Sequence, residues 1–174
     1  MSADPFSAIS PLDNRYRDPD AERYFSDTAY IAYKLKVERA LIKALARRGV
    51  CPPSVVQEIE EACGAVTPEE VEAEETKVRH DIRALVNVIR SKVSDEAKPY
   101  VHMTATSYDI TDTANAARFR DAVREAVIPA LKNLERILVD LSLRGAKTVQ
   151  VGRTHGQHAV PTTFGYALSH YVSR

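Results

Sequence analysis

The chain has 174 residues, of which 44% are hydrophobic and 28% are charged, a composition that allows a packed core and argues against disorder. Basic and acidic residues number 24 each, and this balance argues against a protein that holds nucleic acid by its phosphates. Cys51 and Cys63 are too few for a disulfide framework or a four-cysteine zinc site and fit a reducing compartment. The first residues carry no signal-peptide pattern, and no apolar run approaches the roughly 20 residues that a bilayer requires. We therefore expect a soluble, cytoplasmic protein without a membrane partner.

Helical signals begin after residues 1–25, which contain several prolines and which we expect to form an irregular arm. The helix starts are marked by residues whose side chains can cap a helix, and Gly49 is a typical stop. Thr67 and Glu70 form a capping-box pattern around a proline, which predicts a further helix start. The expected helices, in chain order, run from Ser26 or Asp27 to Gly49, over about 54–62, from Thr67, and over about 79–93.

Residues 107–144 then carry a helical pattern of unusual length. At about 1.5 Å per residue, this helix would exceed roughly 50 Å and would be too long to bury its apolar stripe against a small domain. It indicates one rod of a long bundle or a subunit interface. We expect Pro129 to bend the helix without ending it. After an extended loop at 146–161, a last helix is expected to open at Thr162 or Thr163.

The fold class that these elements predict is all-α. We expect an N-terminal helical domain at 1–105, followed at 106–174 by the first part of an elongated helix bundle. The last helix continues to the final residue without a stop signal. Together with the long rod, this suggests a piece of a longer protein.

Polar residues cluster beside the expected helices, where functional groups are often placed. Arg15 and Tyr16 offer a planar fork of donors and a hydroxyl, which suit a phosphate or carboxylate; a solvated arm is the alternative. Arg79 and His80 stand at a helix start, where free backbone N–H groups favour an anion. Asp81 either orients His80 or caps the helix, and a plain capped start is the alternative there.

Two further clusters follow in the second half of the chain. Thr106 and Ser107 bring hydroxyls to the start of the long helix, although such residues also serve as ordinary caps. In the segment 152–165, glycines bracket His155, and a histidine can donate or accept a proton near neutral pH. His155 and His158 are an alternative pair of metal ligands, but no acidic residue or cysteine lies nearby in the sequence to complete a site. We therefore expect no metal.

In this order, the clusters resemble the fumarase/aspartase superfamily and, within it, the adenylosuccinate lyase branch. The segments that carry the resemblance are SPLDNRY at 10–16, RHDIRA at 79–84, HMTATSYDITDTA at 102–114 and, most specifically, GRTHGQHAVPTTFG at 152–165. The resemblance implies an all-α homotetramer without metal or organic cofactor. It also implies a β-elimination in purine biosynthesis that releases fumarate from adenylosuccinate, giving AMP, and from SAICAR, giving AICAR.

The resemblance also implies roles for individual residues. They are His155 as general acid with Thr154 beside it, Arg15 and Tyr16 for phosphate, Arg79, His80 and Asp81 for substrate contacts, Thr106 and Ser107 for the succinyl part, and His102 and Gln157 in support. Thr104 stands where the family commonly has glycine, so the shape of that loop is in question. The serine loop that supplies the family's base is absent from these residues, so we expect the chain alone to be inactive.

Two alternatives stay open. One is another lyase of the superfamily, or a carboxymuconate-type cycloisomerase, that acts on a dicarboxylate without phosphate. The cycloisomerases usually lack a histidine at the position of His155, and fumarase and aspartase lack the opening pair formed by Arg15 and Tyr16. The other alternative is a non-catalytic helical interaction module with an enzyme-like sequence.

Overall fold

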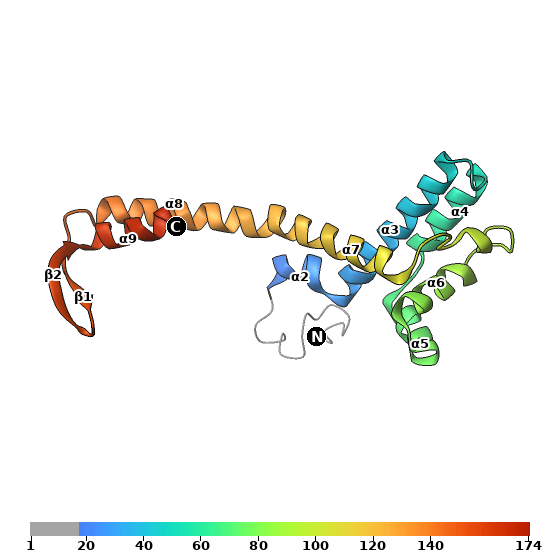
Figure 1. Cartoon of the computed structure of the whole chain (residues 1–174), viewed down its shortest axis with the longest axis horizontal. Helices are drawn as coiled ribbons and strands as arrows, with labels where there is room; N and C mark the ends of the chain where they lie inside the picture. Colours follow the sequence, from blue (N-terminus) through green and yellow to red (C-terminus); the bar gives the residue numbers. More distant parts are fainter. Residues whose placement is uncertain (1–17) are drawn as a thin grey trace. The chain divides into compact units, whose positions relative to one another are not determined.

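The computed structural model describes residues 18–174 and is mainly α-helical, as predicted (Figure 1). It forms two compact units, which divide between Ala122 and Val123. The first unit contains α2 (Pro19–Phe25), α3 (Asp27–Arg47), α4 (Pro53–Gly64), α5 (Pro68–Val78), α6 (Asp81–Ser91), the 3₁₀ turn η2 (Lys98–Tyr100) and α7 (Ser107–Ala122). The second contains the π-helical turn η3 (Val123–Val127), α8 (Ile128–Arg144), strands β1 (Val149–Thr154) and β2 (Gln157–Thr163), and α9 (Phe164–Ser173). No helix within residues 18–174 is both long and apolar enough to cross a bilayer.

The predicted helix caps are largely confirmed. The Ser26 hydroxyl accepts a hydrogen bond from the backbone N–H of Ala29 at 3.2 Å and so starts α3. Thr67 and Glu70 form the complete capping box of α5. The prediction of an irregular arm up to residue 25 was wrong for its last residues, which form the short helix α2. The Asp18 carboxylate starts this helix by accepting hydrogen bonds from two backbone N–H groups. This helix has only 7 residues, too few to reveal a helical period in the sequence.

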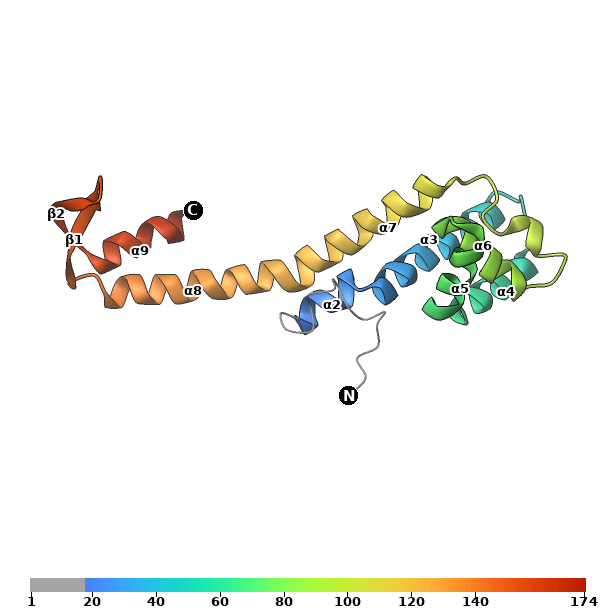
Figure 2. The same ribbon diagram turned by 90° about the horizontal axis from the view of Figure 1, so that it is seen from below.

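The core of the first unit lies where α3, α4 and α6 meet (Figures 1 and 2). The apolar stripe predicted for α6 is buried along its length. Burying one large aliphatic side chain contributes about 1.5–3 kcal/mol, so this stripe is a main source of the unit's stability. The largest fully buried side chains are Ile42, Ile59, Ile82, Leu85, Ile89 and Ile110.

The boundary expected between residues 105 and 106 does not coincide with the division between the compact units. The first unit extends through α7 because Ile110 and Ala114 are buried in it. The Tyr33 hydroxyl of α3 also donates to the Asp121 carboxylate of α7 at 2.9 Å. How a longer protein would divide into domains stays a prediction.

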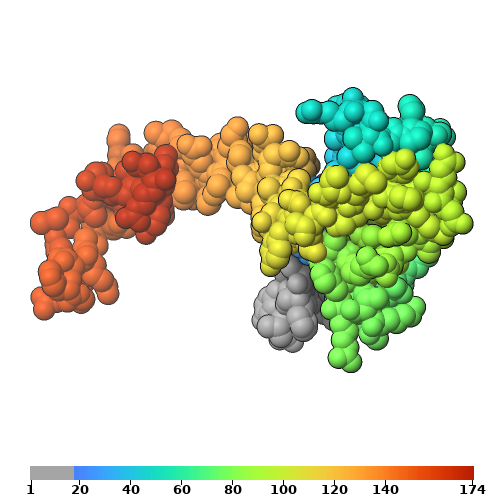
Figure 3. Space-filling model, turned by 45° about the vertical axis from the view of Figure 1, so that its right-hand side comes forward, coloured from blue at the N-terminus to red at the C-terminus, as the bar shows by residue number. Residues whose placement is uncertain are grey.

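Residues 107–144 are helical throughout, but the helix is not uniform. The π-helical turn η3 comes directly before α8, whose first turn contains Pro129. Proline cannot donate a backbone hydrogen bond, and the wider π turn changes which backbone groups are paired just before it. The helical backbone continues through both features. Within the second unit as described, α9 packs along α8 (Figures 2 and 3). Even so, no residue of α8 is buried there, as expected for a rod that cannot cover its own stripe.

The extended loop expected at 146–161 was wrong, because most of this segment forms an antiparallel hairpin of β1 and β2. Thr154 pairs with Gln157, so only His155 and Gly156 form the turn. Both have positive φ, +51° and +73°, as a two-residue type I′ turn requires. The strand pattern in the sequence was limited to Thr148–Val151, which is too short to predict a hairpin. The hairpin leads into α9, whose cap is Thr163 as predicted.

Candidate functional site

The predicted site residues fall into two groups, one in each compact unit. The first unit holds Arg79, His80 and Asp81 at the junction of α5 and α6, and His102, Thr106 and Ser107 in the segment leading into α7. The second unit holds Thr154, His155 and Gln157 around the hairpin turn. Arg15 and Tyr16 lie outside the described residues.

His80 connects the cluster Arg79–Asp81 with the cluster that contains Thr106 and Ser107. Its Nδ1 accepts a hydrogen bond from the backbone N–H of Arg83 at 3.3 Å and caps α6, so the alternative that Asp81 is the cap was wrong. Because Nδ1 is an acceptor, the proton of neutral His80 lies on Nε2. Nε2 is 3.4 Å from the hydroxyl of Ser107, which is the first residue of α7. The ring therefore connects the starts of two helices that are far apart in the sequence.

Arg79 occupies the sharp bend between α5 and α6. Its φ of +51° is left-handed, which lets α5 end and α6 begin with only Arg79 and His80 between them. Most non-glycine residues avoid this region, so the bend is conformationally costly. Arg79 therefore stands two residues before the first residue of α6, where backbone N–H groups favour an anion.

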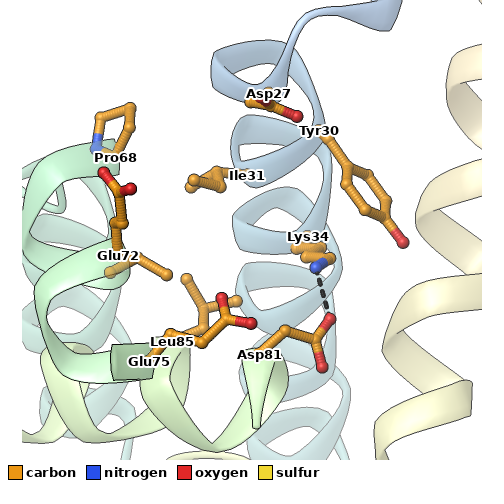
Figure 4. A pocket seen from close by; sticks show the side chains of 10 residues that line it. Asp27, Tyr30, Ile31, Lys34, Pro68, Glu72, Glu75, Asp81 and Leu85 are labelled. Atoms are coloured by element: carbon orange, nitrogen blue, oxygen red, sulfur yellow. Dashed lines mark hydrogen bonds and ion pairs between the residues drawn. The ribbon is translucent and has the colours of Figure 1, made fainter. Parts of the chain in front are cut away.

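Asp81 is held by a buried lysine that the sequence did not single out. The Nζ of Lys34 lies 2.7 Å from Asp81 Oδ2, and the Lys34 side chain is 7% exposed (Figure 4). Both residues line a pocket of about 310 Å³ between α3, α5 and α6. Burial raises the pKa of Asp81, but the hydrogen bond from Lys34, a backbone hydrogen bond from Ile82, and the charges of Lys34 and His80 outweigh it and lower the pKa overall.

His102 also has a buried partner on α3. Its Nδ1 lies 2.6 Å from the Glu38 carboxylate, and Glu38 is 3% exposed. Burial raises the pKa of Glu38, while the hydrogen bond and charge of His102 oppose that shift. His102, His80 and Ser107 line one hollow on the surface of the first unit, which we call the histidine hollow.

Lys34 and Glu38 are the site-related residues that sequence reasoning missed. They stand one helical turn apart on α3, in phase with the buried Ile42 and Leu45. Two opposite charges on the apolar side of a helix were the available signal, because buried charges normally require partners. The sequence alone did not identify those partners.

Besides Arg79, two residues in the segment before α7 have a left-handed backbone. His102 has φ +62° and Thr104 has φ +69°. Thr104 therefore adopts a conformation that glycine adopts freely, at the position where the family commonly has glycine.

The backbone N–H of Thr106 donates to the Asp109 carboxylate at 2.8 Å, which secures the start of α7. Thr106 and Ser107 thus lie at the amino end of this helix.

His155 lies at the tip of the hairpin, and the side chains around it are exposed. Its Nδ1 is 2.8 Å from the hydroxyl of Thr154, so Nε2 is the ring nitrogen left for a ligand. The tight turn fixes the backbone at His155, and the exposure leaves the ring open to a covering surface. Among residues 18–174, no three His, Cys, Asp or Glu side chains gather in a way that would hold a metal ion.

Comparison with known proteins places this geometry in a family. A family model described as a lyase matches residues 13–174. The adenylosuccinate lyase of Archaeoglobus fulgidus is 38% identical over 161 residues, and that of Pyrococcus abyssi is 40% identical over 160 residues. The chain belongs to the fumarase/aspartase superfamily of lyases. As a member of this superfamily it covers only part of its relatives: the two alignments span 92% and 91% of this chain, but 35% of each relative.

Solved structures of the same superfamily agree with the fold. A fumarate lyase from Mesorhizobium sp. BNC1 aligns with a TM-score of 0.81 at 30% identity, over 90% of this chain and 37% of that chain. The 3-carboxy-cis,cis-muconate lactonizing enzyme from Pseudomonas putida aligns with a TM-score of 0.83 at 32% identity, over 93% of this chain and 38% of that chain. The superfamily fold is therefore shared by proteins with different named reactions, and it does not by itself select a substrate.

Proposed function

We propose that this chain supplies the N-terminal part of an adenylosuccinate lyase. The enzyme would release fumarate from adenylosuccinate, giving AMP, and from SAICAR, giving AICAR, in purine biosynthesis. The observation that carries the proposal is the hairpin turn that presents His155, in a chain 38–40% identical to adenylosuccinate lyases. The substrate is the part that the superfamily fold leaves open.

The reaction is a β-elimination in which His155 acts as the general acid. A base removes a proton from the carbon next to a carboxylate of the succinyl group, a carbon–carbon double bond forms, and the carbon–nitrogen bond breaks. The electron pair of that bond stays on the nitrogen, which takes a proton from the acid. Thr154 engages Nδ1 of His155, so Nε2 is the atom that would deliver this proton.

The groups of the first unit would bind the anionic parts of the substrate. We assign substrate contacts to Arg79, His80 and Asp81, and the succinyl carboxylates to Thr106 and Ser107. The contact between His80 and Ser107 supports this assignment, because it brings the two clusters to one place. The amino end of α7 would add backbone N–H groups. Arg15 and Tyr16 remain our candidates for the phosphate.

The base would come from a serine loop outside residues 1–174, and the working enzyme would be a cytoplasmic homotetramer. Two features support assembly with further protein: the exposed hairpin tip, and α8, on which no residue is buried within the described chain. The 174-residue chain alone would then release no fumarate from adenylosuccinate. Gln157, next to the turn in β2, would support the position of His155.

A second candidate is a lactonizing or eliminating enzyme that acts on a dicarboxylate without phosphate. The similarity to the Pseudomonas putida lactonizing enzyme favours it, with a TM-score of 0.83. In this reading Arg15 would have no phosphate to bind. The two candidates therefore differ in their substrate and in the effect of replacing this arginine.

The test uses a full-length protein that contains this chain. Adenylosuccinate, SAICAR and 3-carboxy-cis,cis-muconate are each supplied, and fumarate and lactone are measured. We expect fumarate from the two purine substrates. Arg15→Ala should raise the KM for adenylosuccinate about tenfold or more, because a hydrogen bond to a charged group contributes about 1.5–3 kcal/mol. Turnover of carboxymuconate alone, or an Arg15→Ala variant with an unchanged KM for adenylosuccinate, would contradict the proposal.

A further inference from the structure

We propose that Glu38 is a positioning residue that fixes the ring of His102 in the histidine hollow, so that its Nε2 meets an anionic group of the substrate. The inference rests on the proposed function, because it takes the ligand of the hollow to be part of that substrate. Glu38 touches no substrate in this account and acts only through His102. Its carboxylate engages Nδ1 at 2.6 Å and leaves Nε2 available, whichever of the two groups holds the shared proton.

The burial of Glu38 indicates that this contact has a purpose beyond filling the core. A carboxylate loses its hydration when it is buried, and the loss is compensated only by well-placed partners. Glu38 is 3% exposed and lies on the same side of α3 as the buried Ile42 and Leu45. The neighbouring Cys63 on α4 stays a neutral thiol, because burial and the negative charge of Glu38 raise the pKa of Cys63 to about 12. His102 is thus the polar partner that the structure gives to Glu38.

The backbone at His102 supports the same role. Its left-handed φ of +62° is uncommon for a residue other than glycine. Such conformations persist where the surrounding structure enforces them, and they concentrate at functional sites. The contact with Glu38 spans 64 positions in the sequence and ties this segment to α3. A ring held in this way cannot swing freely out of the hollow.

The other histidine of the histidine hollow is also held through its Nδ1. His80 uses Nδ1 for the backbone of Arg83 and turns Nε2 toward Ser107. Each histidine therefore has its Nδ1 engaged by the protein, and both rings line the hollow. One turn earlier on α3, Lys34 holds Asp81, the neighbour of His80. Helix α3 thus carries both partners, Lys34 for Asp81 and Glu38 for His102.

A double-mutant cycle in the full-length enzyme tests the inference. The variants are Glu38→Gln, His102→Asn and the pair, and the quantity measured is kcat/KM for adenylosuccinate. We expect each single variant to lower kcat/KM by about ten- to a hundredfold, mainly through KM, by analogy with the groups that orient metal-bound histidines. If Glu38 acts through His102, the double variant will be no worse than His102→Asn.

The matched control is Glu60→Gln. Glu60 also pairs with α3, through Arg39 and Lys43, but it lies outside the histidine hollow. We expect its kcat/KM to equal that of the wild type. An unchanged kcat/KM in Glu38→Gln, or losses that simply multiply in the double variant, would overturn the inference.

A second variant and a second readout keep the test decisive. If Glu38→Gln does not fold, Glu38→Asp keeps the charge but shortens the side chain, and we expect a partial loss of kcat/KM with a normal melting temperature. Nitrogen NMR of labelled histidine reads the His102 ring directly, and identical ring signals in wild type and Glu38→Gln would also overturn the inference. If the wild type releases no fumarate, the proposed function fails, while the ring spectrum still decides the role of Glu38.

Discussion

The two compact units hold their polar residues in different ways. In the first, charged side chains near the candidate site meet partners from distant parts of the chain, as Lys34 meets Asp81 and Glu38 meets His102. In the second, the hydrogen bond of His155 goes to Thr154, its immediate neighbour, at an exposed tip. The proposed binding groups are thus set in place by a folded core. The proposed proton donor is set only by a tight turn, and its environment depends on what covers the hairpin.

The same contrast appears in the packing. Helix α6 buries its apolar stripe inside the first unit, whereas no residue of α8 is buried within the described chain. Stability measured on these 174 residues should therefore report mainly on the first unit. The proton donation proposed for His155 should report on the second unit once further protein covers it.

The largest effect is expected at the hairpin, in a full-length protein. His155→Ala removes the proposed general acid, and such groups contribute about 10²- to 10⁴-fold to the rate, so kcat for adenylosuccinate should fall by that factor. His158→Ala is the matched control, because His158 is an exposed residue of the same hairpin, paired with Arg153 in the strand register. Steady-state kinetics measure both variants. Equal losses would mean that the hairpin as a whole matters, rather than the acid.

The next effect tests the packing contrast in the 174-residue chain. Leu85 is 1% exposed, and Leu85→Ala should lower the free energy of unfolding by about 2–5 kcal/mol, because it leaves a cavity. Leu131 of α8 is 57% exposed, and Leu131→Ala should change the free energy of unfolding by no more than about 0.5 kcal/mol. Urea unfolding followed by circular dichroism measures both. A large loss in Leu131→Ala would show that the second unit is covered even in this chain.

A smaller effect concerns the ion pair between Lys34 and Asp81. The pKa of Asp81 lies below its ordinary value of 3.8, so its ionised form adds stability above that pH, and this stability is lost as the pH falls through the folded-state pKa. Lys34→Met should remove about 1 kcal/mol near neutral pH, because the Asp81 side chain is 44% exposed and partly screened. The difference from wild type should shrink as the pH falls below 3.8.

The control for this pair is Lys77→Met, because Lys77 is 70% exposed in its ion pair with Glu74. Pairs of this kind contribute little, so we expect no measurable change in the unfolding midpoint. Denaturation midpoints of wild type, Lys34→Met and Lys77→Met, measured at several pH values, test both expectations. A Lys34→Met difference that stays constant down to acid pH would contradict the electrostatic account and leave only a packing role.

The smallest effect is expected at Thr104. Because its φ is +69°, Thr104→Gly should relieve left-handed strain and raise the free energy of unfolding by about 0.5–1 kcal/mol, despite the greater freedom of glycine in the unfolded chain. Gly49→Ala is the reverse control, since Gly49 has φ +71° with no atom near its missing side chain, and should lose a similar amount. Thermal unfolding measures both. A destabilised Thr104→Gly would mean that the threonine side chain makes a contact of its own.

Local sequence signals determined most of the helical framework. The caps at Ser26, Thr67 and Thr163 and the buried stripe of α6 were all predictable, because each depends on residues within a few positions of one another. The ordered motifs also led to the superfamily. The exceptions were α2, which is too short to show a period, and the hairpin, whose strand pattern in the sequence extends only over Thr148–Val151.

Tertiary structure alone decided how the site is held together. The partners Lys34 and Asp81 are 47 positions apart, and Glu38 and His102 are 64 positions apart, so no local pattern specifies either pair. In the sequence, the position of Lys34 and Glu38 on the apolar side of a helix indicates burial, but only the packing shows which residues they meet. The sequence by itself therefore determined the helical framework, the superfamily and the list of candidate site residues. The fold determined their partners, because a charge that loses water must find its counterpart among whatever the core brings near it.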